Sequence, residues 1–380
     1  MPATHQPLDP PDRLLCGPGP ANVEPAVVAA MQRPMLGHMD PDLQDILAEV
    51  VALLEAVYRR SEGLTLPLSG TGTAGMEAGI ANLTEPGDTV IVGASGYFGF
   101  CIQELARRYG ANLVAVNADW GEVVANERLL EALEEHPDAR LLAIVHAETS
   151  TGVAHPLREL AEAMSGSETL LMADCVTSLG AIELEPAQWG IDYCYSCTQK
   201  GLANPPGMSP ISVSERALER IRRRIAPVGF YLDITLLEQY WIERPAAYHH
   251  TAPILNIYAL HEGLRLMLEE GVEARWKRHA EAGAHFQRRV REGGLELLAD
   301  PGHQLPQLTA IRVPEGMDEK EVQMRLLQEH DIEVGGGLGP TAPSIWRVGL
   351  MGPNATTATA DRVIDAFEAV LADAGTPPSP

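Results

Sequence analysis

Short apolar runs alternate with amphipathic segments through the first two thirds of the chain. The apolar runs, flanked by glycine, proline or polar residues, are typical of buried strands, and the segments between them have helical periodicity. An early helix follows Asp40-Pro41, because an acid at the cap and proline at the first helical position favour a helix start. The predicted strands are 64–68, 89–93, 113–116, 141–146, 170–175 and 193–197, and the predicted helices between them are 73–83, 100–109, 127–135 and 157–164. This order predicts an α/β fold with a mostly parallel sheet flanked by helices.

The pattern changes near residue 256, where longer helices and fewer strands follow. The predicted elements are helices 256–269 and 272–291, strand 308–313, helix 318–329, strand 345–349 and helix 360–374. This mixture predicts a smaller α+β domain. We therefore divide the chain into an N-terminal arm (1–20), a large domain (21–270) and a small C-terminal domain (271–380).

The charge balance narrows the classes of partner. The chain has 380 residues, 45% of them hydrophobic, and a formal net charge of −24. Such a charge opposes binding to nucleic acid or to an anionic membrane, and reflects either acidic helix surfaces or adaptation to salt. The sequence contains no run of 18 apolar residues, and its start lacks the basic and apolar regions of a signal peptide. We expect a cytoplasmic protein.

The five cysteines, at positions 16, 101, 175, 194 and 197, predict neither a disulfide framework nor a metal site. Cys194 and Cys197 form a C-x-x-C, but they lie on a predicted strand, where residues three apart point to opposite faces. There is no second cysteine pair to complete a metal site.

Lysine is rare in this chain, and one lysine has an unusual setting. The three lysines are Lys200, Lys277 and Lys320. Lys200 follows the apolar strand 193–197 and precedes a loop rich in proline and glycine. Burial lowers the pKa of an amine and makes it a nucleophile suited to Schiff-base chemistry. A surface lysine is the alternative interpretation of Lys200 taken alone.

The segment 69–75, Ser-Gly-Thr-Gly-Thr-Ala-Gly, follows a predicted strand and begins a helix. Small residues there let backbone N–H groups and hydroxyls approach an anion at the helix N-terminus. The segment also contains G-x-G-x-x-G, so a dinucleotide site is an alternative. That site needs an acid at the end of the next strand, where Ala94-Ser95-Gly96 stands instead. We therefore predict a site for a single phosphate.

Asp174 ends a predicted strand, and ligands of open parallel sheets bind beyond the carboxyl ends of the strands. An acid in this place is either structural or pairs with a pyridinium nitrogen, which keeps the ring protonated. Residues 96–99, Gly-Tyr-Phe-Gly, offer aromatic rings at the end of another strand, either as core or for stacking on a cofactor.

These features together resemble the alanine–glyoxylate and serine–pyruvate aminotransferase group of the class V aminotransferases, which have the pyridoxal-phosphate fold type I. The resemblance extends from about Leu14 to Thr357. Its specific segments are 17–20, 69–77, 87–99, 146–152, 174–180, 199–200, 248–251 and 346–350.

The resemblance implies roles around a pyridoxal 5′-phosphate ring. Lys200 would bind the cofactor and then move a proton between the substrate and the cofactor. Asp174 would pair with the ring nitrogen, and Thr149 would lie near the ring hydroxyl. Val176 and Phe98 would contact the two faces of the ring. The family often has tryptophan where Phe98 stands, which weakens the expected stacking.

The resemblance also implies a phosphate site, a substrate site and a homodimer. Arg347 would bind the substrate carboxylate, since a guanidinium matches it with two hydrogen bonds, although an arginine on a strand can also be a surface ion-pair partner. Gly19 would line the substrate site. Tyr248 and Thr251 would reach the phosphate of the neighbouring subunit. The phosphate would otherwise be held by Thr71, Gly72, Thr73 and Gln199, and Thr73 stands where some relatives have histidine.

The implied activity is transfer of the amino group of alanine or serine to glyoxylate or pyruvate by a ping-pong mechanism. The alternative within the family is another amine donor, as in serine–glyoxylate, pyridoxamine–pyruvate or aminophosphonate transaminases. Cysteine desulfurases share the fold but need a cysteine well beyond the lysine, whereas the last cysteine here is Cys197. A nucleotide-dependent oxidoreductase is the alternative from another class. The segment 335–339 is either a mobile loop near the substrate or a turn.

Overall fold

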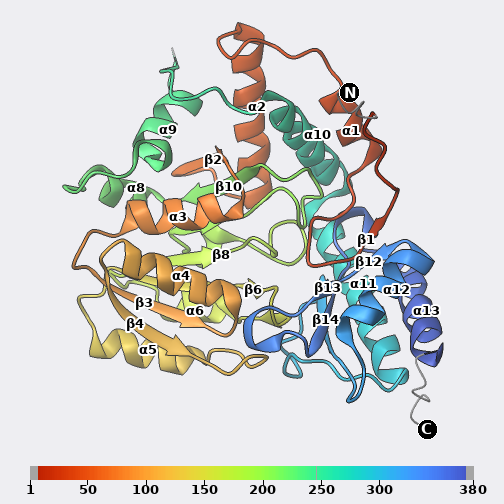
Figure 1. Cartoon of the computed structure of the whole chain (residues 1–380). Coiled ribbons are helices and arrows are strands. Elements are labelled where there is room, and N and C mark those ends of the chain that lie inside the picture. Colours follow the sequence, from red (N-terminus) through yellow and green to blue (C-terminus); the bar gives the residue numbers. More distant parts are fainter. Residues whose placement is uncertain (1–6, 245, 374–380) are drawn as a thin grey trace, which may run out of the picture.

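The computed structural model describes residues 7–244 and 246–373, and its centre is a sheet of seven strands (Figure 1). The strand order is β2 (Leu64–Ser69), β10 (Met208–Val213), β9 (Tyr193–Tyr195), β8 (Leu170–Asp174), β5 (Leu141–Val145), β3 (Thr89–Ala94) and β4 (Asn112–Asn117). β10 is antiparallel to both of its neighbours, and the other neighbouring pairs are parallel. The predicted α/β fold with a mostly parallel sheet is confirmed.

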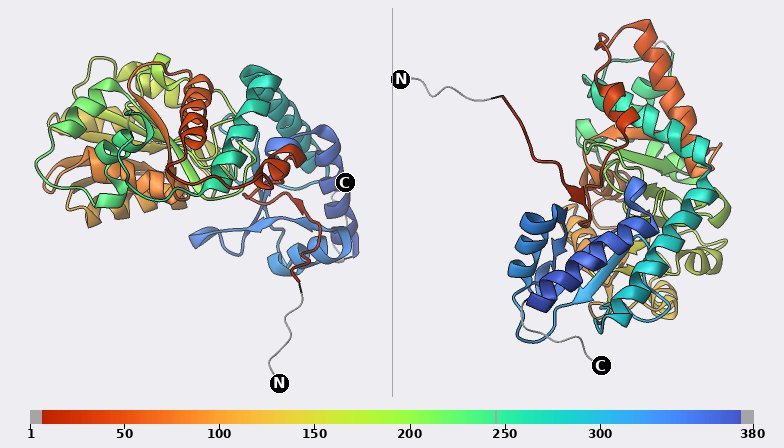
Figure 2. Two further views of the ribbon diagram at one scale, coloured as in Figure 1. Left: turned by 90° about the horizontal axis from the view of Figure 1, so that it is seen from above. Right: turned by 90° about the vertical axis from the view of Figure 1, so that its right-hand side faces the viewer.

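Helices flank this sheet (Figures 1 and 2). α3 packs against β9 and β10, α4 packs against β3 and β4, and α2 packs against β2. Their bounds agree with the predicted ones within about three residues: α2 (Pro41–Tyr58), α3 (Gly72–Leu83), α4 (Tyr97–Arg108), α5 (Asn126–Glu135) and α6 (Leu157–Ala163). The apolar face of α2, which includes Leu43, Leu47 and Leu54, is buried, as its periodicity predicts.

Several elements lie where the pattern predicted none. They are α1 (Pro25–Met31), β10, α8 (Glu215–Arg222), η1 (Phe230–Leu232) and α9 (Ile234–Trp241), together with the short helix α7 (Pro186–Trp189) and the two-stranded pair β6 (Ala147–Glu148) and β7 (Val153–Ala154). The predicted strand 193–197 ends at Tyr195.

The C-terminal part contains a second, three-stranded antiparallel sheet, in the order β11 (Leu308–Arg312), β14 (Ile345–Gly349) and β13 (Gly335–Gly336). The helices here are α10 (Ile254–Glu270), α11 (Val272–Glu292), α12 (Glu319–His330) and α13 (Thr357–Asp373), with short 3-10 turns η2 (Gly339–Thr341) and η3 (Gly352–Asn354). The predicted elements of this part are confirmed within about three residues, and residue 374 of the last helix lies outside the described residues.

The buried apolar side chains form two main clusters, one built from residues between Leu43 and Val272 and one from Cys16 and residues between Ala282 and Val370. The segment before β1 (Leu14–Leu15) leads away from the rest of the chain (Figure 2), and β1 itself pairs with β12 (Ile332–Glu333). Residues 1–6 of the predicted arm lie outside the described residues, and the domain limits at 20 and 270 stay a prediction. Within 7–244 and 246–373, no helix is long and apolar enough to cross a membrane.

Candidate active site

The carboxyl ends of the parallel strands gather most of the predicted site residues. Asp174 is the last residue of β8, and Lys200 lies on the loop that follows β9. Phe98 is in the first turn of α4, which follows β3, and Thr149 directly follows β6. These segments come together because parallel strands place their carboxyl ends on the same edge of a sheet.

Asp174 is a buried carboxyl with two hydrogen-bond donors. The hydroxyl of Tyr195 donates to Oδ2 at 2.6 Å, and the backbone N–H of Val176 donates to Oδ1 at 2.9 Å. Burial raises the pKa of Asp174 to about 7, against the effect of these donors, and the nearby Glu148 adds to the increase. The carboxyl is therefore ready to pair with a cation.

Lys200 is largely buried, and its ammonium group donates a hydrogen bond to the carbonyl of Pro18. Burial lowers the pKa of Lys200, and Arg347 lowers it further, while Cys197 and Asp174 act in the opposite direction. Gly19 lies against the lysine, since a Cβ at this position would be 2.6 Å from Nζ. A lowered pKa increases the fraction of neutral, nucleophilic amine.

The other two lysines have different surroundings. Lys277 is 77% exposed and faces Glu281 at 3.7 Å on α11. Lys320 is exposed in the first turn of α12. Among the three, Lys200 alone has the burial that nucleophilic chemistry needs.

The predicted phosphate loop lies at the N-terminus of α3. Thr71 is the N-cap residue, its side chain makes no capping hydrogen bond, and both Thr71 and Thr73 are exposed. Gly72 is buried, and a Cβ there would lie 2.9 Å from Cγ2 of Val176. Gln199 contributes a buried side-chain oxygen, Oε1, that has no hydrogen-bond partner among the described residues. The loop thus offers helix N–H groups and free hydroxyls to an anion.

Arg347 comes from β14 of the second sheet and is only 6% exposed. Its Nε donates to the carbonyl of Gly336 at 2.6 Å, and a terminal nitrogen donates to the carbonyl of Thr149 at 3.3 Å. Burial lowers the pKa of Arg347 to about 10, and the charges of Glu148 and Glu319 oppose the decrease. The guanidinium therefore stays charged at neutral pH and contacts the loop after β6 that carries Thr149.

The segment 335–339 forms a short strand and the start of a turn. Gly335 and Gly336 form β13, which pairs with β14 at Arg347 and Trp346, and Gly339 begins the short turn η2. The segment is therefore a strand and a turn that support Arg347.

Tyr248 and Thr251 lie on the loop between α9 and α10. Both are exposed, and their hydroxyls are 3.3 Å apart. Their neighbour His250 places Nε2 2.6 Å from Oγ of Ser69, which precedes the phosphate loop. The predicted contact with a neighbouring subunit involves a second chain and stays a prediction.

Two buried residues of the site were missed by sequence reasoning. Tyr195 pairs directly with Asp174 across β8 and β9, and the adjacency of these two strands was the signal that could have found it. Glu148 accepts hydrogen bonds from the backbone N–H groups of Phe98 and Gly99, at 3.1 and 3.2 Å. Its signal was an acid placed two residues after the predicted strand 141–146, among the residues that follow the carboxyl end of that strand.

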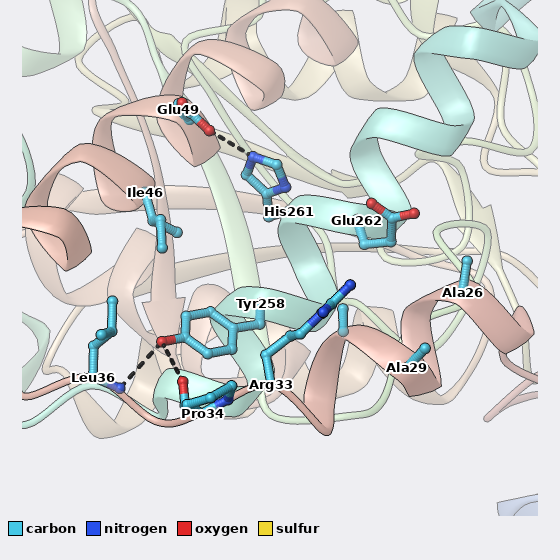
Figure 3. A pocket seen from close by; sticks show the side chains of 11 residues that line it. Ala26, Ala29, Arg33, Pro34, Leu36, Ile46, Glu49, Tyr258, His261 and Glu262 are labelled. Carbon is cyan, nitrogen blue, oxygen red and sulfur yellow. Dashed lines mark hydrogen bonds and ion pairs between the residues drawn. The ribbon is translucent and has the colours of Figure 1, made fainter.

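A cavity of about 610 Å³ lies elsewhere, between α1, α2 and α10 (Figure 3). Ala26, Ala29, Leu36 and Ile46 give it apolar walls, and the hydrogen-bonded side chains of His261 and Glu49, 2.8 Å apart, also line it. None of the predicted site residues lines it.

Comparison with known proteins defines the class of the chain. The structure of alanine–glyoxylate aminotransferase from Nostoc sp. superposes with a TM-score of 0.94 at 46% identity, covering 97% of this chain and 98% of that one. Ureidoglycine–glyoxylate aminotransferase from Bacillus subtilis superposes with a TM-score of 0.95 at 35% identity, covering 98% and 96%. These structures share the fold type I architecture, so the chain is an aminotransferase of this fold.

The sequence comparisons give the family. The model of the class V aminotransferases matches residues 19–372. The chain is 40% identical over 373 residues to alanine–glyoxylate aminotransferase of Rattus norvegicus, covering 97% of this chain and 90% of the relative. The chain belongs to the class V aminotransferase family, as its motifs indicated.

Proposed function

We propose that the chain transfers the amino group of alanine or serine to glyoxylate or pyruvate, with pyridoxal 5′-phosphate as cofactor. The observation that carries the proposal is the set of three buried groups at the edge of the sheet. They are an amine with a lowered pKa (Lys200), a carboxyl with a raised pKa (Asp174) and the guanidinium of Arg347. The names of the relatives from Nostoc sp. and Rattus norvegicus support alanine and glyoxylate as substrates.

The donors at the N-terminus of α3 fit the phosphate of this cofactor. Thr71 and Thr73 offer hydroxyls, and the side-chain amide of Gln199 has a buried oxygen without a partner among the described residues. Gly72 leaves no side chain between the loop and Val176. A helix N-terminus with such hydroxyls suits a phosphate group.

The surroundings of Asp174 fit a cationic ring nitrogen. Burial raises its pKa in spite of its two hydrogen-bond donors, so a cation beside the carboxylate would stabilise the charged form. In the proposal, Val176 and Phe98 contact the ring faces, and Thr149 binds the ring hydroxyl. Gly19 lines the substrate site and keeps the amine of Lys200 accessible by having no side chain of its own.

The chain's own groups perform the proton transfers. Pyridoxal 5′-phosphate supplies a ring that accepts the electron pair left when the substrate loses its α-proton. Lys200, as a neutral amine, removes that proton and returns it at the neighbouring position. Arg347 orients the substrate by its carboxylate. A second keto acid reverses the sequence, so we expect ping-pong kinetics.

Replacing Arg347 by methionine is expected to lower kcat/KM for alanine by about 10²- to 10³-fold, mainly through KM, because two charge-assisted hydrogen bonds to the carboxylate are lost. Steady-state kinetics with alanine and glyoxylate measures the change. The matched control is Arg312→Met, at the exposed end of β11 in the same sheet. Equal losses in both variants would contradict the role of Arg347.

A different amine donor is the second candidate. The relative from Bacillus subtilis is named for ureidoglycine, and serine, pyridoxamine or an aminophosphonate could also serve a class V enzyme. Desulfurase chemistry is disfavoured, because burial raises the pKa of the Cys197 thiol to about 12 and suppresses the thiolate.

The proposal includes a homodimer in which Tyr248 and Thr251 reach the partner's phosphate. Support comes from exposed apolar side chains on the segment before α2, where Met35 is 70% exposed and Met39 is 56% exposed. His38 of this segment packs edge-on against the ring of Tyr248, with the ring centroids 5.4 Å apart. A second copy would cover this surface. All five cysteines are free thiols, which agrees with the proposed cytoplasmic location.

The visible absorption spectrum tests the proposal. The purified protein with pyridoxal 5′-phosphate should show the yellow band of a lysine-bound cofactor, which alanine bleaches and glyoxylate restores. If another amine bleaches the band but alanine does not, the proposed cofactor would stand and the proposed amino donor would be wrong. The absence of a band would contradict the proposed cofactor.

A further inference from the structure

Glu148 is a buried carboxyl that binds the first turn of α4. It is 1% exposed, and Oε2 accepts hydrogen bonds from the backbone N–H groups of Phe98 and Gly99 at 3.1 and 3.2 Å. Its other oxygen, Oε1, accepts from the backbone N–H and the hydroxyl of Ser150 at 3.0 and 2.6 Å. The side chain of Glu148 thus accepts four hydrogen bonds from N–H and O–H donors, which stabilise a carboxylate.

Ser150 completes the same cap. Its Oγ accepts a hydrogen bond from the backbone N–H of Tyr97 at 2.8 Å, so the first three N–H groups of α4 all have partners on the loop 148–150. The two segments also touch closely, because a Cβ on Gly96 would lie 2.5 Å from Cγ of Glu148. The position of Phe98, in this first turn, is thus set by Glu148 and Ser150.

The same loop holds the arginine from the second sheet. The carbonyl of Thr149, between the two capping residues, accepts a hydrogen bond from Arg347 at 3.3 Å. Further along the loop, the carbonyl of Gly152 accepts from the N–H of Leu305 at 2.9 Å. The loop therefore joins the N-terminus of α4 to the part of the chain that carries Arg347.

The charge of Glu148 acts on the surrounding titratable groups. It raises the pKa of Asp174 and of Cys101, and it opposes the decrease that burial causes in the pKa of Arg347. Burial also raises the pKa of Glu148 itself, while its four donors oppose this increase. Removing the charge would lower the pKa of these neighbours.

We propose that Glu148 is a positioning residue, which holds Phe98 against the cofactor ring and fixes the loop that places Arg347 for the substrate carboxylate. The inference rests on the proposed function, since it gives these two residues their roles. It concerns a residue that would act through its neighbours, without touching the substrate.

Glu148→Gln tests the inference, because glutamine keeps the shape but removes the charge and replaces one acceptor with a donor. We expect the dissociation constant of pyridoxal 5′-phosphate, measured by quenching of tryptophan fluorescence, to rise by about 10-fold or more, the range for losing a hydrogen bond to a charged group. KM for alanine should rise as well. The pH dependence of the cofactor's visible band should move to lower pH, because the negative charge of Glu148, which raises the pKa of Asp174, is lost.

Two further variants separate the effect of the hydrogen bonds that cap α4 from the effect of the negative charge of Glu148. Ser150→Ala removes part of the cap but keeps the carboxylate, so cofactor affinity should fall while the pH dependence stays unchanged. Glu85→Gln is the matched control, since Glu85 also accepts two backbone N–H groups, from Ile225 and Ala226, but on the loop after α8. It should change neither property.

The outcomes distinguish this inference from the proposed function. A folded Glu148→Gln protein with wild-type cofactor affinity, KM and pH dependence would overturn the inference while the function stands. If Glu148→Gln does not fold, unchanged cofactor affinity in Ser150→Ala would overturn it instead. A wild-type protein that shows no band with pyridoxal 5′-phosphate would remove the proposed function and the inference together.

Discussion

Lys200→Ala is expected to lower the rate of amino transfer by at least about 10⁴-fold, the upper range for a positioned proton-transfer group. The alanine variant removes the amine that would both bind the cofactor and move the proton. Single-turnover measurements with alanine, followed by the visible band, give the rate of the first half-reaction.

Lys277→Ala is the control, because Lys277 is exposed on α11 and distant in sequence from the site. It should keep wild-type activity. A Lys200→Ala protein with an appreciable fraction of the wild-type rate would contradict the assignment of Lys200 as the catalytic amine.

Asp174→Asn is expected to lower kcat by about 10- to 10³-fold, because a carboxylate beside a ring nitrogen raises its pKa by about one to three units, and each unit is a factor of ten in protonation. Asparagine can still accept the hydrogen bond from the N–H of Val176, so the decrease in kcat measures the effect of removing the negative charge of Asp174. Single-turnover kinetics over a pH series measures it. An unchanged kcat at neutral pH would contradict the pairing.

The same substitution is expected to stabilise the protein when it is freed of cofactor. The pKa of Asp174 in the folded chain is about 7, above its ordinary value, so the folded state binds this proton more tightly than the unfolded state does. The resulting stability is present below about pH 4 and is lost as the pH rises through about 7. An asparagine side chain does not titrate and has no such loss, so the variant should gain up to about 4 kcal/mol at pH 8 and little near pH 4. Urea unfolding of both proteins at about pH 4 and pH 8 measures the difference in their free energies of unfolding. A difference that does not change with pH would contradict the prediction.

The sequence predicted the elements whose patterns are regular. Apolar runs such as 170–173 are buried as a whole, and parallel sheets make such runs continuous. Asp174 and Lys200 were found because their residue types are unusual at the ends of such runs. The family motifs then agreed with the comparisons over residues 19–372.

The strand β10 was missed for a physical reason. Pro210 lies within it and pairs with Pro67 of β2, while the strand stands between two others in the sheet. Proline has no N–H to donate and is expected at edges, so the segment does not look like a central strand. Although Pro210 has no N–H to donate, its carbonyl still takes part in the sheet. It accepts hydrogen bonds from the N–H of Ser196 and from the hydroxyl of Tyr58.

The other features that the sequence did not predict depend on contacts between residues far apart in the chain. Glu148 acts on Phe98, which is 50 residues away in the sequence, and no local pattern reports such a pair. The predicted strand 193–197 ends at Tyr195, and a turn follows at 198–199, just before Lys200. The roles proposed for Tyr248 and Thr251 depend on a second chain and stay a prediction.

Reduction with sodium borohydride followed by peptide mapping tests the central claim most directly. The protein is loaded with pyridoxal 5′-phosphate, reduced and digested, and mass spectrometry locates the fixed cofactor among the three lysines. We predict the adduct on the peptide that contains Lys200, and none after Lys200→Ala. An adduct only at Lys277 or Lys320, or no adduct at all, would contradict the account of this site.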